Sequence, residues 1–431
     1  SEMCIRDRRR DKSEKPPALY DLTTLQRDAN RLLGFTAQQT LDYLQNLYEK
    51  KLCTYPRTDS RYLTSDMAEG LPVLVNLVAN AMPFRKGIAI SCDAGAVIND
   101  KKVTDHHAVI PTRNLQGADL SGLPVGEKAV LELVALRLLC AVAQPYTFAE
   151  TAVVVECAGA EFTAKGRTVK NYGWRALDAA YRAALKNAEP DKETEDKALP
   201  DGGRLPELSE GQTLPLSGAT VKEGKTSPPK HFTEDTLLSA MENPVRYMEN
   251  RDSSLVKTIG EAGGLGTVAT RADIIEKLFR SFLLEKKGNE IYLTSKARQL
   301  LKLVPADLKK PELTASWEMQ LNDIAKGKKR RDAFMKEIRS YTVELIEEIK
   351  TEEGTFRHDN LTNKKCPNCG KRLLAVNGKN AKMLVCQDRE CGYRETVSRT
   401  TNARCPVCHK RMEMIGKGED ATFVCSCGHK E

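Results

Sequence analysis

Apolar residues recur every three or four positions between residues 20 and 50, and this spacing predicts two consecutive helices. Residues 23–26 form a capping-box sequence at the start of the first helix, and Gly34 is its predicted C-cap. Residues 36–39 have the same capping form and start the second helix. The predicted buried faces are Leu25, Ala29, Leu32 and Leu33, then Leu41, Leu44, Leu47 and Tyr48.

The pattern changes further along the chain. Residues 126–142 have helical spacing again, and their predicted buried side is Val130, Val134 and Leu138. Residues 148–162 are β-like and include a β-branched run at 151–155. Residues 187–211 are polar, acidic and interrupted by prolines and glycines, which indicates an exposed loop or an insertion in a β-rich domain. From Pro228 to Glu353 the signal is mainly helical, and residues 355–365 are predicted to be a linker.

Composition indicates a globular protein of several domains. The chain has 431 residues, of which 40% are hydrophobic and 29% charged, so two to four domains with cores are expected. No stretch approaches the roughly 20 apolar residues of a membrane span, and no secretory signal peptide is present. We therefore expect a cytoplasmic protein without a membrane partner. The net charge of +8 is compatible with a polyanionic partner, although a bulk value is weak evidence.

Cysteine usage favours a reducing compartment with metal sites over a disulfide framework. Eight of the 13 cysteines lie in paired spacings from Cys366 onward. The other five are scattered singly: Cys4, Cys53, Cys92, Cys140 and Cys157.

Candidate chemistry centres on Tyr55, which follows the second predicted helix in a turn, with Arg57 and Arg61 shortly after it. A tyrosine hydroxyl titrates near ~10 and is by itself a poor nucleophile. Nearby guanidinium groups favour the phenolate and hold a phosphate diester against it. This chemistry suits a tyrosine that becomes covalently joined to a nucleic-acid backbone. For an isolated Tyr-Pro-Arg, the default alternative is a surface turn with a half-buried tyrosine.

A wider set of motifs resembles the type IA DNA topoisomerases, and the topoisomerase III branch in particular. Residues 54–63 (TYPRTDSRYL) resemble the active-site signature of that family. Three further matches follow in the family's order, at residues 105–112, 228–234 and 264–273. The resemblance extends from about Tyr20 to Gly327 and resumes in the cysteine-rich tail.

The resemblance implies roles for residues of the tyrosine loop. Tyr55 would attack a single-stranded DNA phosphodiester and form a 5′-phosphotyrosyl link. Arg57 would position Tyr55 and stabilise the scissile phosphate, and His106 would contact DNA nearby. Asp59 is a further DNA-binding candidate that would orient Arg57 or the loop, with a turn-forming Asp that caps a helix as an equal alternative. Arg61 is either a backbone-phosphate contact or a solvated side chain.

The glycine-rich residues 263–267 lead into a predicted helix with Thr270 as N-cap and Asp273 at N3. Its predicted apolar face is Ile274, Ile275, Leu278 and Phe282. Glycines let a phosphate approach the backbone, and a helix start favours an anion, but alone this is an ordinary turn and cap. By resemblance, Thr270 contacts a backbone phosphate, and Thr267 and Arg271 are further candidate DNA contacts.

The tail contains a repeated Cys-x-x-Cys unit whose spacing is typical of Zn²⁺ ligands. The first predicted set is Cys366, Cys369, Cys386 and Cys391, and the second is Cys405, Cys408, Cys425 and Cys427. Disulfides are the competing interpretation, which the spacing and the expected compartment disfavour. The second set closes more tightly, and His409 or His429 could replace one of its cysteines. Each ribbon is too short for a sizeable core, so metal would supply much of its folding free energy.

Aromatic and basic residues near the cysteines suit single-stranded nucleic acid, with a purely structural knuckle as an equal alternative. These residues are Tyr393, Arg394, Lys410, Arg411 and Phe423.

The expected fold class is a multidomain α+β protein, a portion of the type IA toroid. By analogy it comprises a helical gate domain at 20–140, a β-rich hinge domain at 141–227 and a helical DNA-binding domain at 228–353. A linker at 354–365 and zinc ribbons at 366–396 and 405–431 follow, the second ribbon being a candidate for truncation. Residues 1–19 are an unmatched leader, of which Ser1 to Asp11 is a charged stretch.

Family members begin with a TOPRIM domain that carries an acidic Mg²⁺ site, whereas only 54 residues precede Tyr55 here. We therefore expect a fragment without that domain, with the Mg²⁺ site in the missing part. The resemblance implies cleavage of one strand, strand passage and religation without ATP, and no Gly-x-x-x-x-Gly-Lys-Ser/Thr loop contradicts this. Expected partners are single-stranded or negatively supercoiled DNA and, as one option, a helicase, with the protein a monomer.

The main alternative is a DNA-binding module without turnover, because the missing domain would supply the acids and Mg²⁺ that assist cleavage. We predict little or no turnover by this chain alone. A tyrosine recombinase is a third option, but it needs an Arg-His-Arg set ahead of its tyrosine, and none precedes Tyr55.

Overall fold

The computed structural model describes residues 3–431, apart from residues 86, 158, 189–204, 206–210, 216–217, 219, 352–357, 359, 379, 389, 417 and 419–420. The chain divides into two compact units. The first contains Ser1–Leu278, Lys286–Tyr292 and Pro311–Met319. The second contains Phe279–Glu285, Leu293–Lys310 and Gln320–Glu431.

Two capped helices begin the first unit, as the sequence predicts. Helix α1 spans Leu22–Leu33 and ends at Gly34, whose φ of 71° is left-handed. Its capping box is formed by Asp21 and Thr24, so the helix starts earlier than the predicted box at residues 23–26. Helix α2 spans Ala37–Glu49, and the predicted reciprocal bonds between Thr36 and Gln39 are present.

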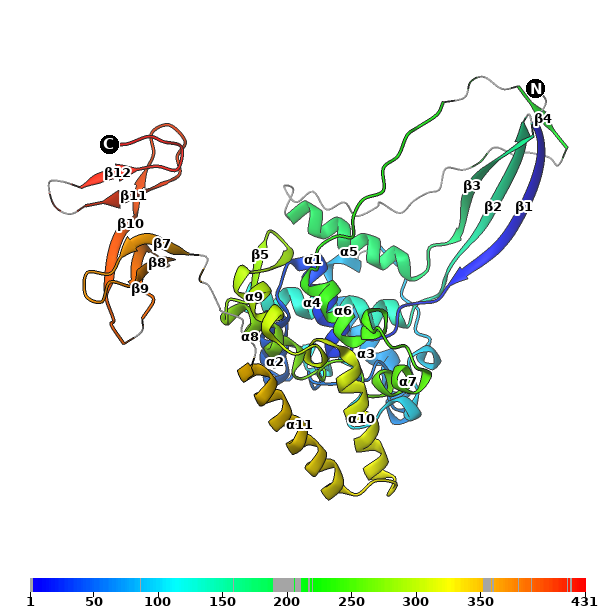
Figure 1. Cartoon of the computed structure of the whole chain (residues 1–431). Coiled ribbons are helices and arrows are strands. Elements are labelled where there is room, and N and C mark those ends of the chain that lie inside the picture. Colours follow the sequence, from blue (N-terminus) through cyan, green and yellow to red (C-terminus); the bar gives the residue numbers. More distant parts are fainter. Residues whose placement is uncertain are drawn as a thin grey trace. The chain divides into compact units, whose positions relative to one another are not determined.

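The core of this unit is helical. Helix α4 (Val125–Ala141) is buried on nearly all sides, including the predicted Val130, Val134 and Leu138. Around it lie α1, α2, α3 (Leu71–Ala81) and α5 (Trp174–Ala188) (Figure 1). Short 3₁₀ helices complete the region: η1 Ser65–Met67, η2 Pro83–Arg85, η3 Ala94–Ala96, η4 Asp100–Lys102 and η5 Arg113–Leu115.

A four-stranded antiparallel sheet contains the predicted β-like segment. Its order is β3-β2-β1-β4, with β1 Met3–Glu14, β2 Tyr146–Cys157, β3 Ala160–Asn171 and β4 Thr213–Leu214. Strand β1 pairs with β2 from Cys4↔Glu156 to Glu14↔Tyr146. Residues 3–14 of the predicted leader (residues 1–19) therefore form strand β1 of this sheet. The predicted loop at 187–211 falls almost entirely outside the described residues.

Residues 228–351 are mainly helical, as expected, with one unpredicted hairpin of β5 Leu284–Lys287 and β6 Glu290–Leu293. Helix α8 ends at Arg280, so Phe282 is not part of its apolar face. Phe282 instead has a left-handed φ of 55° and is 75% exposed. The helices are α6 Glu234–Glu242, η6 Pro244–Tyr247, α7 Ser253–Glu261, α8 Arg271–Arg280, α9 Ser295–Leu303, η7 Asp307–Lys309, α10 Pro311–Ala325 and α11 Arg331–Thr351. None of the described helices has the length and apolarity needed to cross a membrane.

The tail forms one six-stranded antiparallel sheet in the order β12-β11-β10-β9-β8-β7. Strand β10 is long and pairs with β9 through its first half and with β11 through its second half. The segment predicted as a linker, residues 354–365, contains β7. The strands are β7 Leu361–Lys365, β8 Arg372–Asn377, β9 Ala381–Cys386, β10 Arg394–Arg404, β11 Arg411–Ile415 and β12 Thr422–Val424.

Candidate functional site

The loop that carries Tyr55 begins at a strained turn after α2. Lys51 has a left-handed φ of 60°, which a residue with a Cβ adopts only at a cost. Its carbonyl accepts hydrogen bonds from the Thr112 hydroxyl and from Asn114 Nδ2, the latter at 3.0 Å. These bonds hold the turn and direct the chain into the tyrosine loop.

The segment 105–112 supports this loop, so two motifs that are separate in sequence become neighbours. The backbone N–H of Thr54 donates to Ile110 O at 3.0 Å, and Ala108 N donates to Tyr62 O at 2.9 Å. Cys53 and Pro111 form a β-bridge. The two segments thus pair through their backbones.

This pairing brings Tyr55 against His106. Their ring centroids are 4.1 Å apart with an interplanar angle of 32°, and the Thr58 hydroxyl donates to His106 O at 2.9 Å. Tyr48 of α2 packs edge-on against the Tyr55 ring at 5.6 Å. Tyr55 is half-buried and His106 is exposed. Among the described residues the Tyr55 hydroxyl has no hydrogen-bond partner, so it can meet a ligand.

Arg57 is held by a residue that sequence analysis did not identify. Its Nη1 donates to Gln45 Oε1 at 2.7 Å, and Gln45 Nε2 donates to Glu49 Oε1 at 3.0 Å. Gln45 and Tyr48 lie one turn apart on α2. The helical periodicity could have shown that they share a face, but not that this face meets the tyrosine loop.

Asp59 and Arg61 do not join this group. Asp59 is exposed and makes no hydrogen bond or ion pair with Arg57 within the described part of the chain. Arg61 is half-buried, and its Nε donates to the carbonyl of Leu19 at 3.3 Å. The predicted roles of both residues on DNA stay predictions.

The second loop, residues 263–270, needs glycine for a steric reason. Gly264 has a φ of 90°, and a Cβ there would lie 2.1 Å from Met241 O. Leu265 N donates to the same carbonyl at 2.6 Å, which fixes the close approach of loop and α6. The hydroxyls of Thr267 and Thr270 are exposed and 3.1 Å apart, directly before α8.

Arg271, which was expected at the same interface, is buried instead. It is 2% exposed. Its guanidinium donates to Gly263 O, to Leu265 O at 3.2 Å and to Thr23 Oγ1 at 2.9 Å. Burial lowers the pKa of Arg271, although the charges of Glu242 and Asp21 oppose this. All of its bonding nitrogens are therefore engaged by the protein itself.

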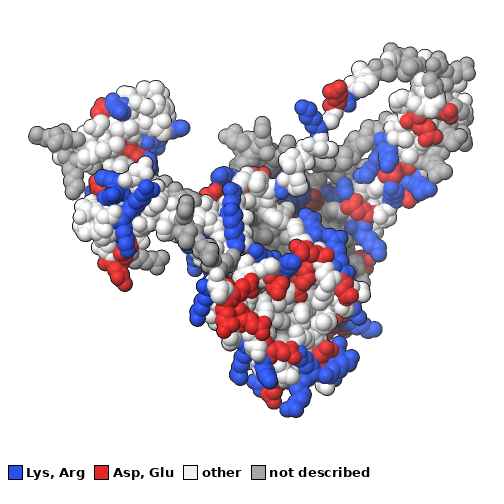
Figure 2. All heavy atoms as spheres, viewed as in Figure 1, with Lys and Arg blue, Asp and Glu red and all other residues white. Residues whose placement is uncertain are grey.

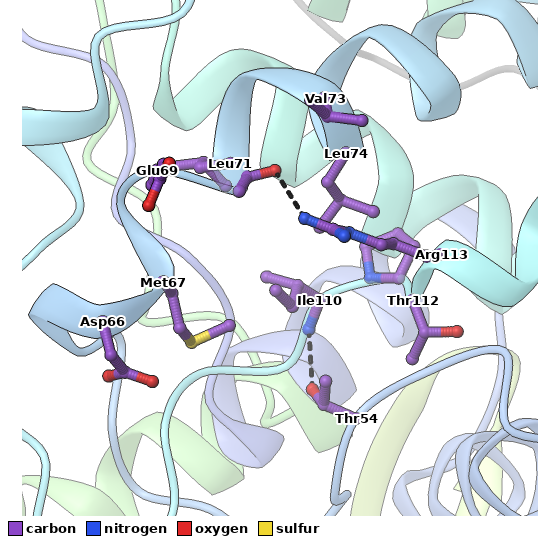
Figure 3. A pocket seen from close by; sticks show the side chains of 12 residues that line it. Thr54, Asp66, Met67, Glu69, Leu71, Val73, Leu74, Ile110, Thr112 and Arg113 are labelled. Carbon is purple, nitrogen blue, oxygen red and sulfur yellow. Dashed lines mark hydrogen bonds between the residues drawn. The ribbon is translucent and has the colours of Figure 1, made fainter.

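A cavity of about 610 Å³ lies beside the base of the tyrosine loop (Figure 3). Thr54 lines it from one side, and Arg113 reaches across to the Gly70 carbonyl at 3.5 Å. Asp66 and Glu69 provide carboxylates at its edge, whereas Tyr55 is not among its lining residues.

Lys and Arg side chains are spread over the face seen in Figure 2, and two regions of the fold each carry several of them. One is the sheet of β1–β3, which carries Lys12, Lys165, Arg167 and Lys170. The other is the turn between α10 and α11, which carries Lys326, Lys328, Lys329, Arg330 and Arg331. Such patches suit a phosphate backbone.

Each set of four tail cysteines converges on one point. Within each set the sulfur atoms lie within 4.8 Å of one another, and all eight thiols are free. The closest Sγ–Sγ distances are 3.4–3.6 Å, close to the roughly 3.8 Å that tetrahedral Zn–S bonds of about 2.3 Å require. Cys427 completes the second set, so neither His409 nor His429 is needed. In the described residues these are the only groups of three or more side chains that could hold a metal.

In each set the pKa of one thiol is lowered, while hydrogen bonds with neighbouring thiols and burial raise the pKa of Cys386 and Cys408. At Cys366, burial opposes the thiolate, but backbone N–H groups of Asn368 and Cys369 and neighbouring thiols lower its pKa to about 7. At Cys425, the backbone N–H of Cys427 is the main cause that lowers the pKa to about 6. Thiolates are the form that binds Zn²⁺.

The comparisons with known proteins agree on one protein family. The sequence profile of a family described as DNA topoisomerase matches residues 2–336. DNA topoisomerase 3 of Bacillus licheniformis and of Bacillus subtilis are each 50% identical to the chain over 423 residues. The alignments cover 96% of this chain and 56% of those proteins. DNA topoisomerase 3 of Shouchella clausii is 47% identical over 427 residues.

The chain thus spans little more than half the length of the curated relatives it matches. Among solved structures, full-length topoisomerase I from Thermotoga maritima is similar, with a TM-score of 0.57 and 19% identity. That similarity covers 100% of this chain and 59% of the other, and it supports the predicted fold class.

Proposed function

The chain belongs to the DNA topoisomerase family, and from this premise we propose that it provides the nucleophilic tyrosine and the DNA-binding loops of a bacterial type IA topoisomerase III. The observation that carries the proposal is Tyr55, held 4.1 Å from His106 with Arg57 on the same loop and its hydroxyl free of protein partners in the described chain. Identity of 50% to proteins named DNA topoisomerase 3 supports it.

The proposed reaction is a transesterification. Tyr55 Oη attacks the phosphorus of a single-stranded phosphodiester, the P–O3′ bond breaks, and the 3′ oxygen leaves and takes up a proton. The 5′ phosphate remains esterified to Tyr55. After strand passage, the 3′-hydroxyl loses its proton and attacks the same phosphorus. The bond between phosphorus and Tyr55 Oη then breaks, the phosphodiester re-forms, and the Tyr55 phenolate takes up a proton. Because the phosphotyrosine bond conserves the energy of the broken bond, no ATP is required.

Arg57 and His106 would act on the scissile phosphate. The Gln45 contact keeps the Arg57 guanidinium on the side of α2 that faces the tyrosine loop, where its remaining donors can bind phosphate oxygens. His106 packs on the Tyr55 ring and exposes its edge to a bound strand. Thr267 and Thr270 offer exposed hydroxyls for a second backbone phosphate.

The two cysteine sets would each hold one Zn²⁺, which stabilises the ribbon fold. Basic and aromatic residues on the ribbons would then bind single-stranded DNA. The described residues contain no carboxylate cluster that fits Mg²⁺, so we assign no Mg²⁺-dependent step to them. A Mg²⁺ site elsewhere in the topoisomerase, like a helicase partner, stays a prediction.

Trapping of the covalent intermediate tests the proposal. A 3′-labelled oligonucleotide with sulfur in place of one O3′ atom has a better leaving group, so cleavage needs no acid to protonate it. We expect the chain to form a labelled protein adduct that survives denaturing electrophoresis. The Tyr55→Phe variant should form none, because only the phenol oxygen can make the ester.

A matched variant, Tyr48→Phe, checks that removal of a nearby hydroxyl is harmless. Equal labelling of wild type and Tyr55→Phe would contradict the proposal, and binding without any adduct would favour the non-catalytic module. Relaxation of negatively supercoiled plasmid measures turnover separately, and little is predicted for this chain alone.

A further inference from the structure

We propose that Arg271 is a positioning residue: it fixes the glycine-rich loop relative to the tyrosine loop, so that a strand held at Thr270 presents a phosphodiester to Tyr55. This inference rests on the proposed function and assigns Arg271 a role different from direct DNA contact.

The contacts of Arg271 are those of a fixed connector. Two carbonyls of the glycine-rich loop, those of Gly263 and Leu265, accept from its guanidinium. A third donor reaches Thr23 in the first turn of α1, 248 residues away in sequence. The side chain is 2% exposed, and no carboxylate lies within ion-pair distance among the described residues. A buried cation without an ion pair is costly, so these three bonds are its main compensation.

The first turn of α1, which contains Thr23, also contacts the tyrosine loop. The neighbouring residue, Leu22, donates its backbone N–H to Thr58 O at 3.1 Å. The Thr58 hydroxyl donates to His106 O at 2.9 Å, and His106 packs on Tyr55. Three hydrogen bonds, linked through the covalent chain at Leu22–Thr23 and within Thr58, therefore connect Arg271 to the group around the nucleophile.

The arrangement matters because one DNA strand must satisfy both loops at once. If Thr270 and Tyr55 each engage a phosphate of the same strand, the separation of the loops has to match the separation of the phosphates. Misplacement by about 1 Å can cost about 100-fold in rate, even when binding is unchanged. A rigid connection between the loops therefore means that a DNA strand bound at Thr270 has its phosphodiester aligned with the Tyr55 hydroxyl.

Arginine suits this task better than lysine. Its planar fork offers several donors in fixed directions, so one side chain can hold three acceptors from two elements. A lysine would keep the charge but could not hold all three acceptors with the same geometry.

The test uses the whole chain and the sulfur-substituted oligonucleotide. Thr23→Val removes only the hydroxyl that accepts from Arg271, and Thr23→Ser keeps it. We expect Thr23→Val to lower the adduct-formation rate about tenfold or more, with affinity for an uncleavable oligonucleotide within about twofold. Thr23→Ser should restore the rate. Arg271→Lys should lower the rate in the same way, and the Thr23 variants keep the test valid if that protein does not fold.

A double-mutant cycle distinguishes alignment from general damage. Thr270→Val should reduce the second-order rate in the wild type, but should have little further effect in the Thr23→Val background, because the connection is already broken. Additive effects would overturn the inference, as would a Thr23→Val rate equal to wild type. Weaker DNA binding by Arg271→Lys, with the adduct rate at saturating DNA retained, would restore Arg271 as a DNA contact. Absence of any adduct in the wild type would instead contradict the proposed function.

Discussion

At the scale of single residues, Gln45 shows how a polar side chain becomes part of a site through one bond. It lies on α2 and accepts from Arg57 at 2.7 Å. Gln38 lies on the same helix, is half-buried like Gln45, and donates to Asp42 Oδ1 at 2.8 Å. The two glutamines therefore form a matched pair, one bonded to the tyrosine loop and one bonded within α2.

We predict that Gln45→Leu lowers the rate of covalent adduct formation about tenfold, because Arg57 loses the bond that orients it. The exchange Gln45→Glu with Glu49→Gln keeps both the acceptor for Arg57 and the bond between residues 45 and 49, and should retain most of the rate. Gln38→Leu is the control and should behave as wild type. A rate for Gln45→Leu equal to that of Gln38→Leu would show that Arg57 needs no such support.

A second residue-scale feature is the group formed by the buried Tyr20 and the half-buried Asp28 and Arg137. The Tyr20 hydroxyl donates to Asp28 Oδ2 at 2.7 Å, and Arg137 contacts both partners and stacks on the Tyr20 ring. Burial alone would raise the pKa of Asp28. Arg137, with further contributions from Arg31 and Tyr20, outweighs burial and lowers the pKa of Asp28 below its ordinary value.

Because the pKa of Asp28 is lower in the folded protein, its stabilising effect is present above the unfolded value of roughly 3.9 and is lost as pH falls through the folded pKa. We predict that Asp28→Asn reduces the free energy of unfolding by about 2 kcal/mol at neutral pH, since it leaves Arg137 without its charge partner. The difference from wild type should shrink towards pH 3 in denaturant titrations. The control is Asp332→Asn, which removes an exposed ion pair with Arg330. It should change the free energy of unfolding by less than about 0.5 kcal/mol.

At the scale of elements, the glycine-rich loop depends on backbone geometry more than on side chains. Gly264 is left-handed and lies against α6, where a Cβ would approach Glu242 O to 2.4 Å. Gly260, four residues earlier in α7, has open space around it and ordinary helical geometry. Alanine substitutions at Gly264 and at Gly260 therefore distinguish the steric requirement for glycine from the effect of helix propensity.

We predict that Gly264→Ala destabilises the protein by about 2 kcal/mol or more, because strain and overpacking add. Gly260→Ala should be neutral or stabilising by up to about 1 kcal/mol, since alanine favours helix. Thermal unfolding of the two variants measures the difference. Similar melting temperatures would mean that the loop can move away from α6 at little cost.

At the scale of the whole molecule, the chain divides into units stabilised in different ways. The first unit has a large helical core around α4. Each cysteine set has only a small apolar cluster beside it, formed around Leu373 in one ribbon and Met412 in the other. We therefore expect bound metal to supply much of the folding free energy of the ribbons, and apolar burial to supply that of the helical core.

We predict that the purified chain binds two Zn²⁺, one for each set, and that calorimetry resolves more than one transition. A strong chelator should abolish or shift the transition of the ribbons and leave that of the helical core in place. Cys366→Ser should lower the zinc content by about one ion per chain, whereas Cys92→Ser should not change it. A single unfolding transition that the chelator does not change would contradict the prediction that metal stabilises the ribbons.

The sequence alone determined the features that depend on short-range spacing. The helices from residue 22 to 49, the cap at Gly34 and the cysteine sets were predictable, because periodicity, capping and ligand spacing act over a few residues. The motif order also indicated the family, which the comparisons confirmed. The motifs also placed Tyr55 and His106 in one predicted site, and the structure brings their two rings together.

The tertiary structure decided what depends on contacts between distant residues. No local pattern shows that Arg271 is buried against Thr23, that Gln45 meets Arg57, or that residues 3–14 complete a sheet with β2. From the sequence, Arg271 was predicted to be a DNA contact, whereas in the folded chain it is buried and bonds to other parts of the protein. Burial is a property of the packed chain, and it decides whether a charged group faces DNA or the protein itself.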